Sequence, residues 1–393
     1  MSTETPIVTQ GQDAVFPAAE LGTRIAAARR VLAERDIDVY IVTGPENIFY
    51  LTGQQTPGYY TFQALLLPVE GDPWFVVREL EYANLLANSW VSQVERYADN
   101  ADPVQVVSSL VDRLGWSNRR IAIDKRGWFL PIALYEALVD SLGAVADAAG
   151  AVETLRRVKS PLEIDKISQA AGYTDAGMRA GLAAVREGGT DNDLVAAMMQ
   201  ASIAAGGEYV GMEPLVSVDK RTGVPHGTWR RGTLGSNSPA FLEMSSCHDR
   251  YHATLMRCAW VGEPPSEARH MMDVCLEGLD AALDKLEPGN TCADVHDACQ
   301  AVVDKAGYTD AFKKRLGYSI GISFAPDWGE GGVLSLYTGV DVELVPGMAF
   351  HVVPALRSFG EFTVCVSETA VVTEQGHRIL GTVPRGMHVV TEG

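Results

Sequence analysis

The chain has 393 residues, of which 47% are hydrophobic and 21% charged, a composition typical of a folded protein with two domains. Its net charge is −18, and its densest basic runs are only two or three residues long. A nucleic acid or an anionic membrane is therefore not an expected partner, because binding to phosphates needs clustered positive charge.

The apolar runs are all far shorter than the roughly 20 residues that cross a bilayer. No basic and then apolar leader opens the chain, so we expect a cytoplasmic protein. The six cysteines contain no CxxC pair, which favours free, mostly buried thiols over disulfides or a zinc site.

The first part of the chain predicts an α/β domain over residues 1–155. Residues 1–16 are polar and without periodicity, which indicates a loose arm, and helical spacing of apolar residues follows at 21–35. Strands are then predicted at four short apolar runs, 38–43, 64–69, 74–77 and 120–123. Helices are predicted between and after them, at 79–88, 103–114 and 131–142. Such alternation is typical of an α/β domain.

A second domain, residues 156–393, begins at a strong helix signal. Ser160 can cap the free amides, Pro161 suits the first turn and Glu163 completes a capping box. Two helical segments precede strand-rich residues 214–261, and two more precede strand-rich residues 347–380, in which 362–373 alternate apolar and polar. The four helical segments are 163–186, 191–205, 266–286 and 292–306. This order predicts an α+β domain with internal quasi-repetition.

Glu243 is the most informative acidic residue. It interrupts the apolar run 240–244, which reads as a buried strand. A buried carboxylate is costly unless it is paired or used in function. An ion pair with an arginine such as Arg257 and a functional role are equally open here.

Other candidate residues have ordinary structural explanations. His226, between Pro225 and Gly227, is either a surface residue or an acid–base group. Trp328, in a glycine-rich segment, either packs its loop or contacts a ligand. Glu361 and Glu368, on or beside a strand, point either into a site or into water.

Two adjacent aromatic residues, Tyr59 and Tyr60, follow Pro57-Gly58 in a loop of the first domain. Such rings can stack on a flat or cationic ligand. They are equally suited to a contact between subunits, where aromatic residues are enriched.

Taken together, these segments resemble the creatinase/prolidase/methionine-aminopeptidase family over nearly the whole chain. The motifs that carry this resemblance are 159–164, 225–227, the strands around Glu243 and Arg257, 288–289, 317–321 and 346–348. The resemblance implies a creatinase-like N-terminal domain and a C-terminal catalytic domain with the pita-bread fold.

Peptidases of this family hold two metal ions with two Asp, one His and two Glu. The positions that match these ligands are Glu243, Thr254, Tyr318, Val353 and Ser367. Only Glu243 can still bind a metal there, although Glu368 follows Ser367 directly. The resemblance therefore implies no metal and no other cofactor, and it argues against peptidase activity by metal-bound hydroxide.

Within the metal-free branch of the family, the chain most resembles the ectoine hydrolases. The similar segments are 227–231, 241–246, 318–321 and 366–369. This implies hydrolysis of the cyclic amidine of ectoine to N-acetyl-2,4-diaminobutyrate in ectoine catabolism. His226 and Glu243 are then catalytic: Glu243 attacks the amidine carbon or activates a water, and His226 carries the proton to the leaving nitrogen.

The resemblance also implies a homodimer with shared active sites for a small zwitterionic substrate, ectoine. Tyr59 or Tyr60 of one subunit would cover the ring in the other subunit's site. The remaining substrate-binding candidates are Tyr318, Trp328, Glu330, His351, Glu361, Glu368 and, for the carboxylate, Arg357. Three alternatives stay open: a metal-dependent X-Pro dipeptidase or aminopeptidase, a creatinase-type amidinohydrolase, and a binding module without turnover.

Overall fold

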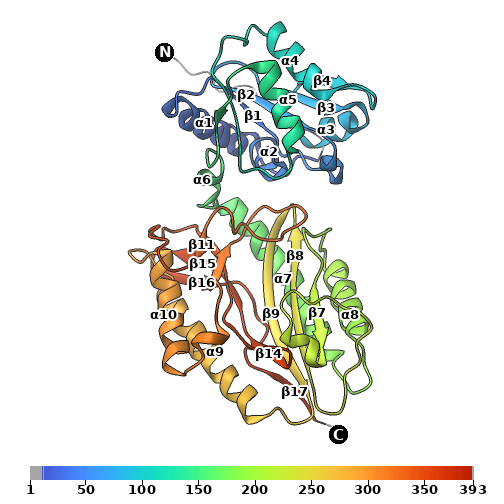
Figure 1. Cartoon of the computed structure of the whole chain (residues 1–393), viewed down its shortest axis with the longest axis vertical. Coiled ribbons are helices and arrows are strands. Elements are labelled where there is room, and N and C mark those ends of the chain that lie inside the picture. The colour runs from blue at the N-terminus through green and yellow to red at the C-terminus, as the bar shows by residue number, and fades with distance from the viewer. Residues whose placement is uncertain (1–10, 12, 392–393) are drawn as a thin grey trace. The chain divides into compact units, whose positions relative to one another are not determined.

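The computed structural model describes residue 11 and residues 13–391, and the chain divides into two compact units, Met1–Arg156 and Arg157–Gly393 (Figure 1). In the described part of the chain, no helix is both long enough and apolar enough to cross a membrane.

The N-terminal unit is a mixed six-stranded sheet with helices. Its sheet order is β4 (Gln93–Tyr97), β3 (Trp74–Arg78), β2 (Ala64–Pro68), β1 (Val39–Val42), β5 (Ile121–Ile123) and β6 (Ala146–Asp147). Strand β1 pairs antiparallel with β2 and parallel with β5. The helices are α1 (Ala18–Glu34), α2 (Pro45–Thr52), α3 (Tyr82–Asn88), α4 (Pro103–Arg113), α5 (Ile132–Leu142) and α6 (Glu153–Arg156).

The predicted elements of this unit are present, and four further α-helices and strands of its described part were not predicted: α2, β4, β6 and α6. Strand β4 carries Glu95 and Arg96 and lies at the edge of the sheet, so it lacks an apolar pattern. Helix α2 is buried on almost every side, so its sequence lacks a polar face. The prediction of a loose arm over residues 1–16 was wrong at Phe16. This side chain is 1% exposed and packs on Phe49 and Arg24. Residues 1–10 and 12 of that arm lie outside the described residues.

The C-terminal unit has two halves, each built from two helices and one sheet. The first half contains α7 (Pro161–Ala183), α8 (Asp191–Ala204) and the sheet β17 (His388–Val390), β9 (Tyr251–Val261), β8 (Ser238–His248) and β7 (Leu215–Val218). The second half contains α9 (Ser266–Asp284), α10 (Cys292–Lys305) and the sheet β11 (Ser335–Leu336), β10 (Gly317–Ser319), β12 (Ala349–Val352), β15 (Glu368–Thr373) and β16 (Gly376–Ile379). A separate hairpin pairs β13 (Ala355–Ser358) with β14 (Phe362–Cys365).

Figure 1 shows the long strands β8 and β9 in the middle of this unit, with α8 on one side and α9 and α10 on the other. Helices α7 and α8 pack on one face of β8 and β9, whereas α9 and α10 share a second core with the other sheet, the β13–β14 hairpin and the opposite face of β8 and β9. This is the quasi-repeated pita-bread arrangement that the resemblance implies.

Helix α7 begins on the predicted capping box. The Ser160 hydroxyl accepts a hydrogen bond from the Glu163 amide, and the Glu163 carboxylate accepts one from the Ser160 amide at 2.9 Å. Helices α8 and α10 begin on the same kind of box at Thr190 and Thr291.

The alternating segment 362–373 forms two strands rather than one. Strand β14 pairs with β13, whereas β15 pairs with β12 and β16. The break falls at Val366–Ser367, where the Ser367 hydroxyl accepts a hydrogen bond from the Met256 amide at 2.7 Å. The six cysteines are free and buried, which confirms the sequence prediction.

Candidate active site

Glu243 lies on β8 in a buried position, as the sequence predicts. The side chain is 7% exposed and forms no hydrogen bond or ion pair with the described residues. Burial raises the pKa of Glu243 to about 7, although the positive charges of Lys314 and Arg357 oppose the increase. An uncommitted carboxylate with this pKa is suited to exchange protons or to hold a cation near neutral pH.

The ion pair between Glu243 and Arg257 that the sequence left open is wrong. In the register of β8 and β9, Glu243 lies opposite Met256, and Arg257 lies opposite Leu242. Neighbouring residues of a strand point to opposite faces of its sheet, so Glu243 and Arg257 face away from each other. The Arg257 guanidinium instead binds Glu368 at 3.2 Å and several backbone carbonyls.

Two cationic side chains from other elements act electrostatically on Glu243. Lys314 precedes β10, and Arg357 belongs to β13. Burial lowers the pKa of Lys314 to about 8, helped by the charge of Arg357 and opposed by that of Glu243. Burial also lowers the pKa of Arg357, and the charge of Glu243 again opposes this. The three charges therefore influence one another's protonation.

A chain of hydrogen bonds joins four predicted or matched site residues. The Trp328 indole donates to the Tyr318 hydroxyl at 2.9 Å, and Tyr318 lies 3.1 Å from Nδ1 of His351. Nε2 of His351 lies 2.8 Å from the Ser367 hydroxyl. Burial lowers the pKa of His351 to about 3, so the ring is neutral at pH 7. The neutral ring has a single N–H, so it donates to one of these two hydroxyls and accepts from the other.

The glycine-rich segment after β10 lets backbone and rings approach closely. A side chain at Gly329 would meet the Tyr318 ring at 2.4 Å, and one at Gly321 would meet the Glu330 carboxylate at 2.7 Å. Trp328 is buried under this segment at 2% exposure. The packing explanation for Trp328 therefore holds, and the indole still reaches the site through Tyr318.

The three remaining acidic candidates all have partners in the structure. Glu330 forms a buried ion pair with Lys159 at 2.8 Å, next to Ser319. Glu361 is exposed and pairs with Lys220 at 3.1 Å. Glu368 is buried, binds Arg257 and lies 3.0 Å from Arg385. Each of these carboxylates is already paired with a basic side chain. Their contact with a substrate stays a prediction.

His226 lies on an exposed loop after β7 and the short helix η3 (Asp219–Gly223). Its φ of 54° is unusual for a residue with a side chain. The Thr363 hydroxyl, on β14, donates to the Thr222 carbonyl at 2.6 Å. A side chain at Gly223 would clash with the Ser358 and Glu361 backbone. The His226 loop is therefore fastened to the hairpin that carries Arg357.

The two tyrosines predicted to reach a neighbouring site belong to the N-terminal unit. The Tyr59 ring packs edge-on against Phe129 with the ring centres 5.5 Å apart. Tyr60 is 78% exposed. Their contact with a substrate or with a second subunit remains a prediction.

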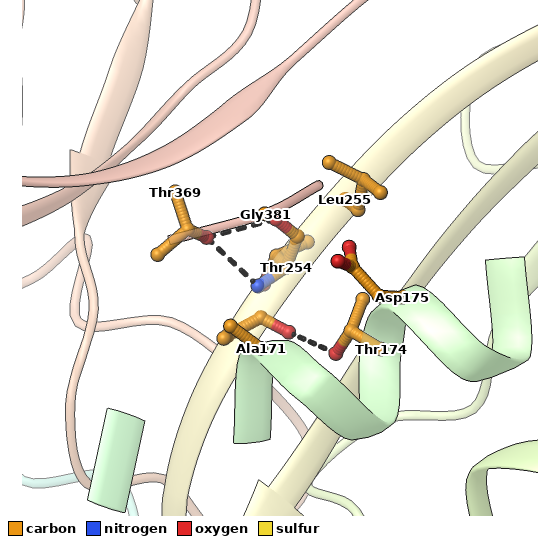
Figure 2. Close-up of a pocket in the computed structure, with 8 residues that line it drawn as sticks. Ala171, Thr174, Asp175, Thr254, Leu255, Thr369 and Gly381 are labelled. Atoms are coloured by element: carbon orange, nitrogen blue, oxygen red, sulfur yellow. Dashed lines mark hydrogen bonds between the residues drawn. The ribbon is translucent and has the colours of Figure 1, made fainter. Parts of the chain in front are cut away.

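A small cavity lies between α7, β9 and β15 (Figure 2), and its lining includes Asp175, Thr254 and Thr369. About 10 Å³ is open to a water-sized sphere, enough for one water molecule. The Thr254 hydroxyl and one oxygen of Asp175 are buried and have no hydrogen-bond partner. We interpret the cavity as a place for one bound water, because its volume excludes an organic substrate.

The residues at the matched metal positions do not fit a two-metal centre. Tyr318 and Ser367 are bound to His351, and the Val353 carbonyl accepts a hydrogen bond from the Lys314 ammonium. Only Glu243 offers a free carboxylate at these positions, whereas hard divalent ions take several oxygen ligands. Throughout the described ranges, no three His, Cys, Asp or Glu residues are grouped to hold a metal.

Lys314 is the site residue that sequence reasoning missed. The run Lys313-Lys314-Arg315 indicated only a short basic patch. Its position directly before the glycine-rich motif could have indicated it. A charged residue between Phe312 and Leu316, which are both buried, costs free energy unless the charge is paired or used in function.

Known families and proteins match this chain over nearly its whole length. Residues 24–158 match the creatinase/prolidase N-terminal domain, and residues 165–374 match metallopeptidase family M24. The ectoine hydrolase of Halomonas elongata is 31% identical, over 95% of this chain and 98% of that protein. The Xaa-Pro dipeptidase of Lactobacillus helveticus is 25% identical, over 91% and 96%.

Among solved structures, the dipeptidase PepE from Mycobacterium ulcerans has a TM-score of 0.83 and 26% identity, covering 96% of this chain and all of that chain. The prolidase from Pyrococcus horikoshii has a TM-score of 0.81 at 18% identity, which shows the shared fold. From its two matched domains, its fold and these relatives, we conclude that the chain belongs to the creatinase/prolidase family of hydrolytic enzymes, metallopeptidase family M24.

Proposed function

We propose that this enzyme opens the cyclic amidine ring of ectoine to N-acetyl-2,4-diaminobutyrate without a metal ion. The observation that carries the proposal is the uncommitted, buried Glu243 carboxylate, in a site where two other matched metal positions, Tyr318 and Ser367, are bound to His351. The similarity to the ectoine hydrolase of Halomonas elongata supports the substrate.

The chemistry of the ring suits a carboxylate. Ectoine carries a planar amidinium cation, which Glu243 can hold by charge-assisted hydrogen bonds. In the reaction, water adds its oxygen to the amidine carbon, one carbon–nitrogen bond breaks, and the released nitrogen gains a proton. Glu243 either accepts the proton of the attacking water or forms the first bond to carbon itself, and the pKa of about 7 matches a base at neutral pH.

His226 would carry the proton to the leaving nitrogen. Its loop is fastened to the β13–β14 hairpin, and its imidazole forms no hydrogen bond within the described ranges. A ring without a fixed partner is available to exchange a proton with a substrate. Tyr318, Trp328 and His351 would then form a rigid wall of the site, because their polar atoms are bound to one another.

The remaining parts of the proposal concern assembly and location. We propose a homodimer in which Tyr59 or Tyr60 of the partner covers the substrate ring, since Tyr60 is largely exposed in the single chain. The six free thiols suit a reducing compartment such as the cytoplasm.

A metal-dependent X-Pro dipeptidase is the second candidate, because the family match and the Lactobacillus helveticus relative favour it. The side chains at the matched ligand positions argue against it. Metal removal separates the two functions, since a two-metal peptidase loses activity with its ions.

The test is to follow ectoine by NMR with protein that has been treated exhaustively with a chelator. We expect ring opening at the rate of untreated protein. We also expect Glu243→Gln to lower turnover by roughly a hundredfold or more, because an amide cannot accept the proton. The matched control is Glu374→Gln, which changes an exposed carboxylate.

Three results would count against the proposal. Near-normal turnover by a folded Glu243→Gln variant removes Glu243 from the mechanism. Activity that is lost with the chelator and restored by divalent ions, together with cleavage of an X-Pro dipeptide, supports the second candidate. Untreated protein that leaves ectoine intact refutes the substrate.

A further inference from the structure

The site contains more positive charge than the protein itself neutralises. Lys314 donates to the Val353 carbonyl at 2.5 Å and lies 3.4 Å from the Arg315 carbonyl. Its ammonium also lies 5.4 Å from the centre of the Phe312 ring. None of these contacts is with a carboxylate, and within the described ranges Lys314 forms no ion pair.

Arg357 is even less engaged. Its guanidinium forms no hydrogen bond or ion pair with the described residues, and its Nε is buried without a partner. Arg357 as a whole is half-buried, and a buried N–H such as its Nε–H is costly without an acceptor, because it has lost water and gained nothing in return. In contrast, Arg257 in the same unit is bound by Glu368 and by several carbonyls.

These cations and Glu243 come from three different segments that contact one another, and the charges of both cations act on Glu243. Arg357 lies opposite Thr363 in the β13–β14 hairpin, and Thr363 is fastened to the loop after β7. Strand β7 pairs with β8 at Leu215 and Glu243. Lys314 reaches the same region through the Val353 carbonyl, just before β13. Within the described ranges, the three side chains form no hydrogen bond or ion pair with one another, so each charge can still be matched by a ligand.

We infer that Lys314 and Arg357 together bind the carboxylate group of the substrate, and that this contact directs the substrate's amidinium toward Glu243. The inference rests on the proposed function for the identity of the ring. A guanidinium fork matches a carboxylate in two hydrogen bonds, and an ammonium adds a third donor. A zwitterionic ring therefore complements both ends of the site: its cation faces Glu243, and its carboxylate faces Lys314 and Arg357.

The experiment compares two substrates on the same variants. One is ectoine, and the other is its decarboxylated analogue, the same methylated tetrahydropyrimidine ring without the carboxylate. For each, kcat and KM are measured by NMR with the wild type, Lys314→Met, Arg357→Met and Lys314→Arg. The control is Lys313→Met, which removes the neighbouring, exposed lysine that pairs with Asp310.

We expect the preference for ectoine, as the ratio of the two kcat/KM values, to fall by about tenfold to a hundredfold in Lys314→Met and in Arg357→Met. The loss should appear mainly in KM for ectoine. Lys314→Arg should keep most of the preference, and Lys313→Met all of it. The ratio is insensitive to partial unfolding, which lowers both activities equally.

Other outcomes decide against the inference or separate it from the proposed function. An equal loss of kcat/KM for both substrates in Lys314→Met and Arg357→Met would show that the two cations do not bind the carboxylate. If the wild type opens neither ring, the proposed function fails, and calorimetric binding of the two compounds then tests the carboxylate site by itself. Tighter binding of ectoine than of the analogue, lost in the two Met variants, would support the inference. Equal binding of both compounds by the wild type would overturn the inference.

Discussion

The protonation state of Glu243 controls what this site can do. Desolvation outweighs the two nearby cations, so the carboxyl holds its proton up to about pH 7. Lys314 shows the reverse effect, because burial disfavours its charged form and lowers its pKa to about 8. Both groups carry the charges that the proposed chemistry needs only between these two values.

The rate should therefore depend on pH as a narrow bell. We expect kcat/KM for ectoine to rise through about pH 7 as Glu243 loses its proton, and to fall from about pH 8 as Lys314 loses its own. In Lys314→Met the alkaline limb should disappear. The acidic limb should move to higher pH, because a positive charge that favours the Glu243 carboxylate is gone. An acidic limb at the ordinary carboxyl pKa of 4.5 would contradict the assignment of Glu243.

At the end of β5 in the N-terminal unit, two acidic residues meet. Asp124 follows the strand directly, and Glu153 begins α6. Asn47 of α2 donates to Glu153 at 2.8 Å and accepts from Arg156 at 2.8 Å. Burial, then the hydrogen bond to Glu153 and its charge, raise the pKa of Asp124 to about 6, because one carboxyl must keep a proton for the other to accept it.

This pair makes the stability of the unit depend on pH. The folded state holds a proton on Asp124 up to about pH 6, whereas the unfolded chain releases it near the ordinary value of 3.8. The free energy of unfolding should therefore decrease as the pH rises from about 4 to 6. In Asp124→Asn the decrease should vanish, because an amide donates to Glu153 without a titrating proton.

Calorimetric unfolding between about pH 3.5 and 7.5 checks this, because that range contains both the ordinary pKa of 3.8 and the raised pKa of about 6. At pH 7 we expect Asp124→Asn to have a higher thermal midpoint than the wild type. The corresponding increase in the free energy of unfolding should be about 1 to 3 kcal/mol. Asp140→Asn, which changes an exposed carboxylate on α5, is the matched control. A variant that is less stable than the wild type at pH 7 would contradict the shared proton.

At the scale of the whole molecule, the proposed homodimer raises the question of whether one chain is sufficient for activity. Tyr59 and Tyr60 belong to the N-terminal unit, and Glu243 and His226 belong to the C-terminal unit. If the aromatic loop of one subunit completes the other subunit's site, each site of the homodimer needs both chains.

Mixing two inactive variants tests this arrangement. A chain with Tyr59→Ala and Tyr60→Ala retains His226, and a His226→Ala chain retains both tyrosines. Random mixed dimers should recover up to about a quarter of wild-type activity, because half of the dimers carry one intact site of two. Size-exclusion chromatography confirms that mixed dimers form. The absence of recovery in such dimers would rule out shared sites.

Local sequence patterns were sufficient for the elements whose causes lie close along the chain. The capping box at Ser160, the apolar run around Glu243 and the spacing of the helices all depend on neighbours within a few residues. These patterns placed Glu243 on a buried strand and His226 on a loop, and the order of the motifs indicated the family.

The partners of the charged residues depended on contacts between distant segments. The register of β8 and β9 sends Arg257 to Glu368 and leaves Glu243 unpaired. Packing of the second half brings Lys314 and Arg357 to Glu243, and it encloses Glu330 with Lys159. A sequence lists the charges but not their separations. Because electrostatic energies depend on separation and burial, pairing is settled only when the chain has folded.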